Sequence, residues 1–268
     1  MVSISSLHIF PVKSTRGISV HQHLVEKRGL AYDRRWVVCD LNGQALTARE
    51  HPLLLGLQVH FEDDKVYLSR RNSSDVVDIS PASFGSQIDV KVFSYATAGK
   101  KMDGHIDQWL SNYLGTACQL VYNDDFISRP VLEKHGGASE DLVGYADQCP
   151  VLLISEASLA SLNAKLAEPV TMAHFRPNIV IKGCDAFAED TWQEIEIGAI
   201  KFRVAQRCQR CVFTTIDPDT FEKSPRQEPL RTLATFRPHP DGGVAFGVHL
   251  IPLSEGPIAI SDEVRILS

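Results

Sequence analysis

Short strand-forming runs separated by tight-turn residues constrain the fold of this chain more than any other feature. Residues 35–40 and 44–47 flank Asn42-Gly43, a dipeptide that commonly closes a two-residue β-hairpin. Residues 57–61 alternate apolar with polar side chains, and Asp63-Asp64 then turns the chain into a second alternating run. Consecutive hairpins of this kind predict a fold built mainly from antiparallel strands.

The same pattern continues along the rest of the chain, with few interruptions by helices. Further strands are predicted at residues 5–10, 88–93, 151–154, 178–181, 194–197, 200–204, 257–260 and 264–266. We expect the last two of these to pair with each other. Helices are predicted at 102–114 and after Ser155, which can act as an N-cap, with a stop near Pro169. The predicted class is mainly β with a few helices (α+β), with a barrel-like core in the second half.

A polar, glycine-bearing stretch without sustained periodicity spans residues 123–147. A chain of 268 residues is long enough for one large domain or two modest ones. We therefore interpret the stretch as a connection between a β-rich domain at 1–125 and a second domain at 126–268. Long connections inside compact proteins often carry functional residues.

Charge and composition narrow the class of protein. Hydrophobic residues make up 44% of the chain and charged residues 22%, as in ordinary soluble proteins. The net charge of −6 argues against nucleic acid as a general partner, although it leaves room for a local basic pocket. The first ten residues have neither a basic flank nor an apolar run suited to a signal peptide or a membrane span. We expect a cytoplasmic protein that engages neither membrane nor nucleic acid.

Cysteine spacing singles out one segment for chemistry. The cysteines stand at 39, 118, 149, 184, 208 and 211. Their scatter predicts reduced thiols rather than a disulfide framework. Cys208 and Cys211 are close together, beside Arg207 and Arg210, and positive charge lowers the pKa of a thiol. A thiolate is a soft metal ligand, so the segment is a candidate metal or redox site.

Three interpretations of this pair remain open from the residues alone. A structural zinc site needs four ligands, and His239 and His249 could supply the missing two, although their spacing matches no common zinc pattern. A dithiol redox couple normally opens a helix after a strand, whereas this segment follows a predicted hairpin. The third interpretation is a single reactive thiolate of open function.

Basic residues placed at the ends of predicted strands suggest an anion pocket. Lys13 and Ser14 follow the first strand, Arg34 opens the first hairpin, and Arg176 precedes a buried strand. An isolated basic residue is most often a solvated surface charge. Arginine nevertheless binds phosphate through two parallel hydrogen bonds, and lysine acts on it as a point charge. Convergence of these side chains would create a site for a phosphate group.

Taken together, several motif blocks resemble a known family. In the first half they are Ile9-Phe-Pro-Val-Lys-Ser14-x-x-Gly17, Leu30-x-x-Asp33-Arg34-x-Trp36 and Thr47-Ala-Arg49. In the second half they are Ser155-Glu-Ala-Ser-Leu159, Phe175-Arg-Pro-Asn-Ile179 with Trp192, Arg207-Cys-x-Arg-Cys211, Thr214-Thr-x-Asp-Pro-Asp-Thr220 and Phe246-Gly247. The chain thus resembles the MOSC proteins, named for the C-terminal domain of molybdenum cofactor sulfurase. The resemblance extends to two-domain members such as the mitochondrial amidoxime-reducing component and bacterial YcbX.

This resemblance implies a β-rich N-terminal domain and a MOSC β-barrel domain, with the molybdenum cofactor (molybdenum bound to molybdopterin) between them. In the family one cysteine ligates the metal, and the motif places that role on Cys211, which leaves Cys208 the more dispensable thiol. Positions that hold the phosphate and pterin of the cofactor correspond to Lys13, Ser14, Arg34 and Arg176. Further matched contacts to the cofactor are Gln148, Cys149, Gln209, Arg210 and His249.

The implied activity is the reduction of N-hydroxylated compounds, such as hydroxylamines, amidoximes and N-hydroxylated purines, to amines. A general acid would assist N–O cleavage, and Asp217 and His249 are the candidates. The alternative function is that of a non-catalytic carrier of the cofactor or its sulfur. A third class, a zinc-stabilised interaction protein, leaves Lys13, Arg34 and Arg176 without a role.

Two departures from the family shape the expected partners. The membrane anchor of the mitochondrial members and the C-terminal ferredoxin domain of YcbX-type members have no counterpart in this sequence. We therefore expect no iron–sulfur cluster within this chain. Either electrons come from a separate redox protein, which would be ferredoxin-like, a flavoprotein or a b-type cytochrome, or the sequence is part of a longer chain that carries the ferredoxin domain.

Overall fold

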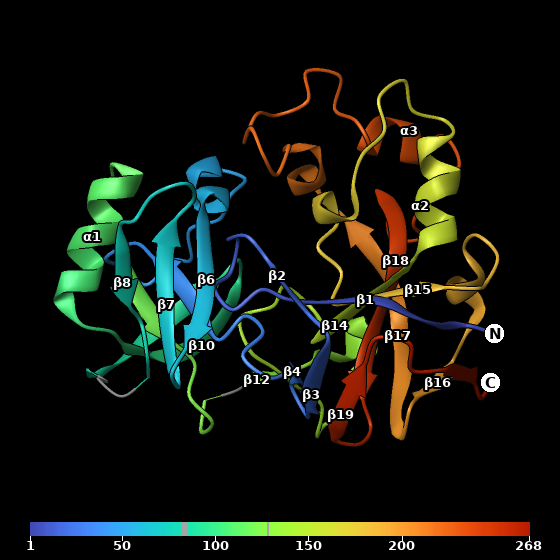
Figure 1. Cartoon of the computed structure of the whole chain (residues 1–268), viewed down its shortest axis with the longest axis horizontal. Coiled ribbons are helices and arrows are strands. Elements are labelled where there is room, and N and C mark those ends of the chain that lie inside the picture. Colours follow the sequence, from blue (N-terminus) through green and yellow to red (C-terminus); the bar gives the residue numbers. More distant parts are fainter. Residues whose placement is uncertain (82–84, 128) are drawn as a thin grey trace.

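The computed structural model describes residues 1–81, 85–127 and 129–268. The described chain forms two lobes, and both termini lie at the same edge of one of them (Figure 1). We call them the α1 lobe, built from residues 36–122, and the barrel lobe, which contains the largest sheet. None of the helices in the described ranges is long and apolar enough to cross a membrane.

The barrel lobe is organised around one eight-stranded sheet. In spatial order its strands are β2 (Ile18–Val20), β1 (Ser3–Ile9), β15 (Ile179–Lys182), β14 (Val151–Ser155), β18 (Val244–Pro252), β17 (Ile200–Arg210), β16 (Glu194–Ile197) and β20 (Val264–Ile266). The sheet closes on itself, because Ile4 N–H donates to Asp262 O at 3.0 Å and Val264 N–H donates to Val2 O at 2.9 Å. The predicted mainly β architecture with a barrel-like core is therefore confirmed.

Two central strands of this barrel, β14 and β18, are buried on both faces. Along β14, Val151 and Leu153 point into the barrel, where their cluster also contains Phe202. Leu152 and Ile154 point outward into a second cluster. That outer cluster is covered by residues of α2 (Glu156–Asn163) and α3 (Leu230–Ala234). Ser155 caps α2 as predicted, since its side chain accepts a hydrogen bond from the Ser158 N–H.

Smaller sheets and α1 (Gly104–Leu114) form the other lobe. One sheet runs β5 (Trp36–Cys39), β11 (Gln119–Tyr122), β10 (Tyr95–Lys101) and β9 (Gln87–Val92). Another runs β6 (Leu57–Glu62), β7 (Lys65–Arg70) and β8 (Val76–Asp78). The predicted hairpin around Asp63 and Asp64 is confirmed, and both residues have the positive φ that a tight hairpin turn requires. Ile106, Leu110 and Leu114 bury the inner face of α1.

Strands from the start of the chain join the barrel rather than the lobe that follows them. β1 pairs antiparallel with β15. β3 (Gln22–Glu26) pairs with both β4 (Gly29–Leu30) and β19 (Gly256–Ala259). Segments on either side of residue 125 therefore mix in space, and the division into 1–125 and 126–268 stays a prediction about sequence order.

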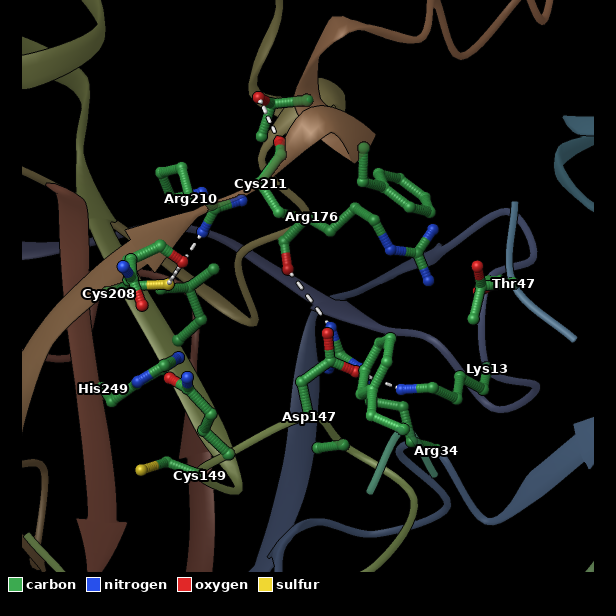
Figure 2. A pocket seen from close by; sticks show the side chains of 18 of the residues that line it. Lys13, Arg34, Thr47, Asp147, Cys149, Arg176, Cys208, Arg210, Cys211 and His249 are labelled. Carbon is green, nitrogen blue, oxygen red and sulfur yellow. Dashed lines mark hydrogen bonds and ion pairs between the residues drawn. The ribbon is translucent and has the colours of Figure 1, made fainter. Parts of the chain in front are cut away.

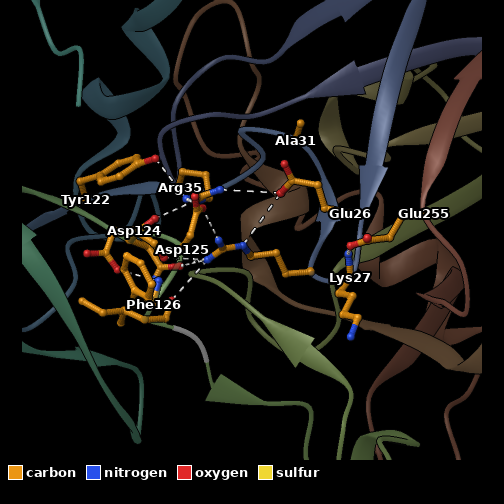
Figure 3. Close-up of polar contacts among 12 residues, drawn as sticks. Glu26, Lys27, Ala31, Arg35, Tyr122, Asp124, Asp125, Phe126 and Glu255 are labelled. Carbon is orange, nitrogen blue, oxygen red and sulfur yellow. Dashed lines mark hydrogen bonds and ion pairs between the residues drawn. The ribbon is translucent and has the colours of Figure 1, made fainter. Parts of the chain in front are cut away.

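The connection predicted at 123–147 is fixed by ion pairs, and its residue 128 lies outside the described residues. Asp125 accepts hydrogen bonds from Arg28 at 2.6 Å and from Arg35 at 2.7 Å (Figure 3). Glu26 Oε2 lies 3.7 Å from Nη1 of Arg35, whereas Asp125 is bonded to Nη2 of that guanidinium group. Two short strands, β12 (Arg129–Pro130) and β13 (Leu142–Val143), interrupt the connection.

The hairpin expected around Asn42-Gly43 is present, because Asp40 N–H donates to Gln44 O at 2.9 Å and Leu46 N–H donates to Val38 O at 2.8 Å. Its second arm forms isolated bridges rather than a continuous strand.

Two expectations about local structure are wrong. The two final strands do not pair with each other, since β19 joins β3 and β20 joins β16. Helix α2 ends at Asn163, ahead of the predicted stop near Pro169. Short 3₁₀ helices, not foreseen, lie at Pro52–Gly56, Glu133–His135, Met172–His174, Ala188–Thr191 and Val212–Thr215.

Gly247 gives a test of how tightly the outer face of the barrel packs. Its φ is +75°, and an added Cβ would lie 2.5 Å from Ile154 Cγ1 and 2.7 Å from Leu153 O. Backbone strain and overpacking together should make Gly247→Ala destabilising by roughly 2–4 kcal/mol in chemical denaturation. Gly104→Ala is the matched control, because nothing lies within 4 Å of its Cβ position and alanine favours helices. Equal stability of the two variants would contradict this packing.

Candidate functional site

A cavity of about 540 Å³ lies between the two lobes. Its walls come from loops and strands that are far apart in sequence, and Figure 2 shows their side chains around one space. The lining residues include Lys13, Ser14, Arg34, Thr47, Arg49, Phe93, Tyr95, Asp147, Gln148, Cys149, Arg176, Asn178, Cys208, Gln209, Arg210, Cys211 and His249.

Three of the lining residues sit on strained backbone. Ser14, Arg34 and Arg176 have φ values of 68°, 47° and 57°, in the left-handed region that residues with a Cβ rarely adopt. Such strain persists only where the surrounding structure imposes it, and it concentrates at functional sites. Here it directs one hydroxyl and two guanidinium groups, from three separate loops, toward a single cavity.

The guanidinium groups of Arg34 and Arg176 share one aromatic platform. Both lie over the Phe10 ring, at 4.6 Å and 4.1 Å from its centroid. Arg34 donates to Asn178 Oδ1 at 3.1 Å and pairs with Asp33, while Arg176 donates to the carbonyl of Thr15. Burial, and after it the nearby charge of Arg34, lowers the pKa of Arg176 to about 9. Two like charges held this close favour the binding of an anion.

Beside Arg34, Asp147 lies between two further cations (Figure 2). Its carboxylate pairs with Lys13 through one oxygen and with Arg49 at 3.1 Å through the other. Burial favours the protonated acid, but the charges of Lys13 and Arg49 outweigh it and lower the pKa of Asp147 to about 2. Burial also lowers the pKa of Lys13, an effect that Asp147 opposes. Asp147 is therefore ionised at neutral pH and cannot serve there as a proton donor.

The thiol of Cys208 lies near the end of β17 with a cation on either side. Arg210 Nη1 donates to Cys208 Sγ at 3.0 Å, and His249 lies between Cys208 and Cys149 (Figure 2). Burial favours the neutral thiol, yet the charges of Arg210 and His249 lower the pKa of Cys208 to about 6. Burial alone would lower the pKa of His249, but its interactions with Cys208 and Cys149 raise that pKa to about 10.

Cys211 begins the segment that leaves the barrel after β17. It is the residue before the 3₁₀ helix at Val212–Thr215, and its carbonyl accepts hydrogen bonds from the Thr214 N–H at 3.1 Å and hydroxyl at 3.0 Å. The residue is half-buried and lines the cavity. The backbone of Cys211 is thus fixed locally, while its side chain remains accessible from the cavity.

The predicted site residues meet in this one cavity, with a single exception. Lining positions are occupied by Lys13, Ser14, Arg34, Gln148, Cys149, Arg176, Gln209, Arg210, Cys211 and His249. Asp217 does not line the cavity. Its carboxylate accepts hydrogen bonds from the backbone N–H groups of Asp219 and Thr220 instead, at 2.8 Å and 2.7 Å. Burial opposes ionisation of Asp217, but these hydrogen bonds outweigh it and lower its pKa, which does not suit a general acid.

The zinc interpretation receives no support from the described residues. In these ranges no three side chains of His, Cys, Asp or Glu gather where they could hold a metal ion. His239 lies 3.8 Å from Asp241 and does not line the cavity that contains Cys208 and Cys211.

Sequence reasoning assigned no role to several residues of the cavity. Asp147 stands next to the predicted Gln148 and Cys149, at the end of the polar connection and just before a buried strand. This position beside two predicted site residues was the sequence signal that could have identified Asp147 as a site residue. Arg49 belonged to a recognised motif block but carried no stated role. Phe93 and Tyr95 enter from the turn between β9 and β10, and no sequence signal marked them.

The donor set suits a large anionic ligand with a soft metal. Cations at Lys13, Arg34, Arg49, Arg176 and Arg210 exceed the carboxylate of Asp147 in the lining. The Nε atoms of Arg49 and Arg210 are buried without a hydrogen-bond partner, which is costly unless a ligand satisfies them. Two thiols share the same cavity. A phosphorylated group with a thiolate-ligated metal matches this combination.

Comparisons with known proteins agree with this geometry. Residues 140–265 match the profile of the MOSC domain, and residues 1–117 match that of the MOSC N-terminal beta barrel domain. Mitochondrial amidoxime-reducing component 1 of Mus musculus is 34% identical over 99% of this chain and 82% of its own length. Mitochondrial amidoxime reducing component 2 of Rattus norvegicus is 36% identical over 88% of this chain and 72% of its own length.

Among solved structures, the YUAD protein from Bacillus subtilis aligns over 98% of this chain and 94% of its own, with 10% identity and a TM-score of 0.46. That score is too low to carry an argument. The near-full-length identity to the animal proteins is decisive, and the chain belongs to the MOSC family that includes the mitochondrial amidoxime-reducing components.

Proposed function

We propose that this protein is a molybdenum-cofactor-dependent oxidoreductase that reduces N-hydroxylated compounds to amines. The observation that carries the proposal is that Cys211 lines the same cavity as Lys13, Arg34 and Arg176. We call these three basic residues, with the segments that carry them, the cationic wall. The names of the relatives, which are amidoxime-reducing components, supply the class of substrate. Hydroxylamines, amidoximes and N-hydroxylated purines are the proposed substrates.

Each wall of the cavity has a part in this proposal. Lys13, Ser14, Arg34 and Arg176 would hold the phosphate and pterin, and Cys211 would ligate the metal. Gln148, Cys149, Gln209 and Arg210 would contact the remainder of the cofactor. When bound, the cofactor would supply a two-electron metal centre for reductive cleavage of the N–O bond.

Protons must accompany the electrons, because reduction of R–NH–OH by two electrons consumes two protons and yields R–NH₂ and water. His249 is the proposed proton donor, since it lines the cavity and its pKa of about 10 keeps it charged at neutral pH. Asp147 is too acidic for this role, and Asp217 lies outside the cavity. The imidazolium of His249 would donate one proton, and the second would come from solvent that enters the cavity. Solvent would also reprotonate His249.

Electrons would come from a separate redox protein, either ferredoxin-like, a flavoprotein or a b-type cytochrome. We propose a cytoplasmic location only because the cysteines are unpaired, since thiols stay reduced in the cytosol. The alternative function, a carrier of the cofactor or its sulfur, draws on the same cavity, so an assay has to separate the two.

Molybdenum analysis and an activity assay together test the proposed function. The protein, purified from a host that makes the pterin cofactor, should contain molybdenum approaching one atom per chain by plasma mass spectrometry. It should reduce benzamidoxime with reduced methyl viologen as the electron donor. Molybdenum without turnover would favour the carrier, and near-stoichiometric zinc without molybdenum would contradict both functions.

The two cavity cysteines give the first prediction. Loss of a group that only orients a metal ligand already costs about 10–100-fold in activity, so loss of the metal ligand itself in Cys211→Ser should cost more than ~100-fold. Cys208→Ser should retain most activity, because its thiolate is ion-paired with Arg210 rather than committed to the metal. Steady-state benzamidoxime reduction measures both, and equal loss in the two variants would point to a dithiol pair.

The second prediction concerns the cationic wall. Arg176→Ala removes one charge-assisted contact to an anion and should lower molybdenum occupancy about tenfold. Its folding should persist, because removal of this buried charge also relieves repulsion from Arg34. Arg176→Lys should keep part of the occupancy, and Arg226→Ala, at an exposed arginine, is the control. Unchanged occupancy in Arg176→Ala would remove this residue from the anion site.

A further inference from the structure

The segment that carries Cys211 folds into a hairpin, and the function described so far leaves its Asp-Pro-Asp motif unused. We call residues 211–224 the Cys211 hairpin. Ile216 forms an antiparallel bridge with Lys223, and Ser224 N–H donates to Thr215 O at 2.8 Å. The carboxylate of Asp217 closes the tip by accepting two backbone N–H groups. Asp217 therefore shapes a turn.

Apolar side chains of this hairpin belong to the core of the other lobe. Ile216 is 1% exposed and lies in a cluster whose other members come from residues 12–122. Phe213 and Phe221 pack against the same cluster, and Phe221 lies against Gly56. The strand β17 ends in the barrel, and the hairpin that follows it crosses to the α1 lobe (Figure 1).

Asp219, at the tip of the Cys211 hairpin, pairs with two arginines that lie outside the hairpin. Its carboxylate lies 3.0 Å from Arg16 Nη1 and 2.9 Å from Arg71 Nη1. Arg71 also donates to the Asp219 carbonyl at 3.1 Å, and Arg16 to the Pro218 carbonyl at 3.5 Å. A single exposed ion pair contributes little to stability, but a network in which two arginines share one carboxylate contributes more.

Both arginines are anchored to the same edge of the α1 lobe. Arg16 N–H donates to Leu57 O at 3.0 Å, and Arg71 N–H donates to Gly56 O at 2.8 Å. Adjacent Gly56 and Leu57 therefore fix the backbone of the two arginines whose side chains hold Asp219.

These contacts tie the hairpin to the cationic wall. Arg16 follows Ser14 and Thr15 directly, and Arg176 donates to the Thr15 carbonyl. Lys223 Nζ donates to the carbonyl of Arg49 at 2.7 Å, and Arg49 in turn pairs with Asp147. The hairpin thus contacts both segments that face Cys211 across the cavity.

We propose that Asp219 is a positioning residue, which clamps the Cys211 hairpin to Arg16 and Arg71 and so fixes the Cys211 side chain opposite the Lys13–Ser14 wall. The inference rests on the proposed function for its catalytic consequence. The clamp itself is a property of the polypeptide and can be measured without cofactor. Asp219 does not line the cavity, so its effect passes through the backbone of the hairpin.

The test compares Asp219→Asn, Asp219→Glu and the matched control Asp241→Asn, which removes another exposed turn carboxylate. Iodoacetamide alkylation of cofactor-free protein is followed at each cysteine by mass spectrometry. Asp219→Asn should speed alkylation of half-buried Cys211 about fivefold, which corresponds to ~1 kcal/mol of lost restraint. Cys118, in the core of the α1 lobe, should keep its native rate in all variants.

In the loaded enzyme, Asp219→Asn should lower kcat for benzamidoxime about fivefold with KM unchanged, since the same restraint is lost and no substrate contact is removed. Asp219→Glu should restore both readouts. A Cys211 rate equal to that of Asp241→Asn would overturn the clamp. A parallel rise at Cys118 would overturn it too, because the effect would then be global unfolding.

The two proposals can fail separately. If the native chain shows no molybdenum and no turnover, the proposed function fails, and the alkylation rates still decide whether Asp219 restrains Cys211. If alkylation changes as expected but kcat in the loaded variant equals that of the native enzyme, the positioning role is contradicted while the reductase stands.

Discussion

Hydrogen bonds between the first strand and the last turn of the chain hold the barrel closed, and the rest of the site depends on that closure. β1 pairs with β15 on one side and bonds to residues 261–264 on the other. Phe10 and Lys13 follow directly from its end. The closed barrel therefore sets where the aromatic platform and the first cation of the cavity lie, before any ligand contributes.

Holding several positive charges in one cavity costs free energy. Neighbouring carboxylates and an aromatic ring partly offset that cost. Asp33 pairs with Arg34, Asp147 pairs with Lys13, and the Phe10 ring lies against two guanidinium groups. Even so, burial and mutual repulsion lower the pKa of Arg176. The folded chain thus holds an electrostatic strain that an anion would relieve, so ligand binding and stability are coupled in the same residues.

Alternation and turn chemistry made much of the fold predictable. The hairpin around Asp63 and Asp64 and the Ser155 cap are local features, and the structure confirms both. β18 escaped prediction because it is buried along its whole length and therefore shows no alternation, and Gly247 interrupts it. The partners of β19 and β20 were mispredicted because pairing between distant strands leaves no local signal.

The site was predictable where motif and charge coincided. Lys13, Arg34, Arg176 and Cys211 were found because a family resemblance reinforced the charge pattern. Asp147 carried no role, because its importance comes from lying between Lys13 and Arg49, two residues remote in sequence. The Asp-Pro-Asp segment was recognised as part of a family motif, but which lobe receives it depends on tertiary structure alone.

Closure of the barrel by the two ends of the chain also dictates when the site can exist. During synthesis the first strand emerges early, yet residues 261–264 follow it only after the rest of the barrel. Until then the N-terminal half of β1 has an open edge, and the Cys211 hairpin has no closed barrel behind it. The cavity therefore forms only once residues 261–264 have been made, and whatever fills it must be captured after that point rather than folded in as the earlier strands emerge.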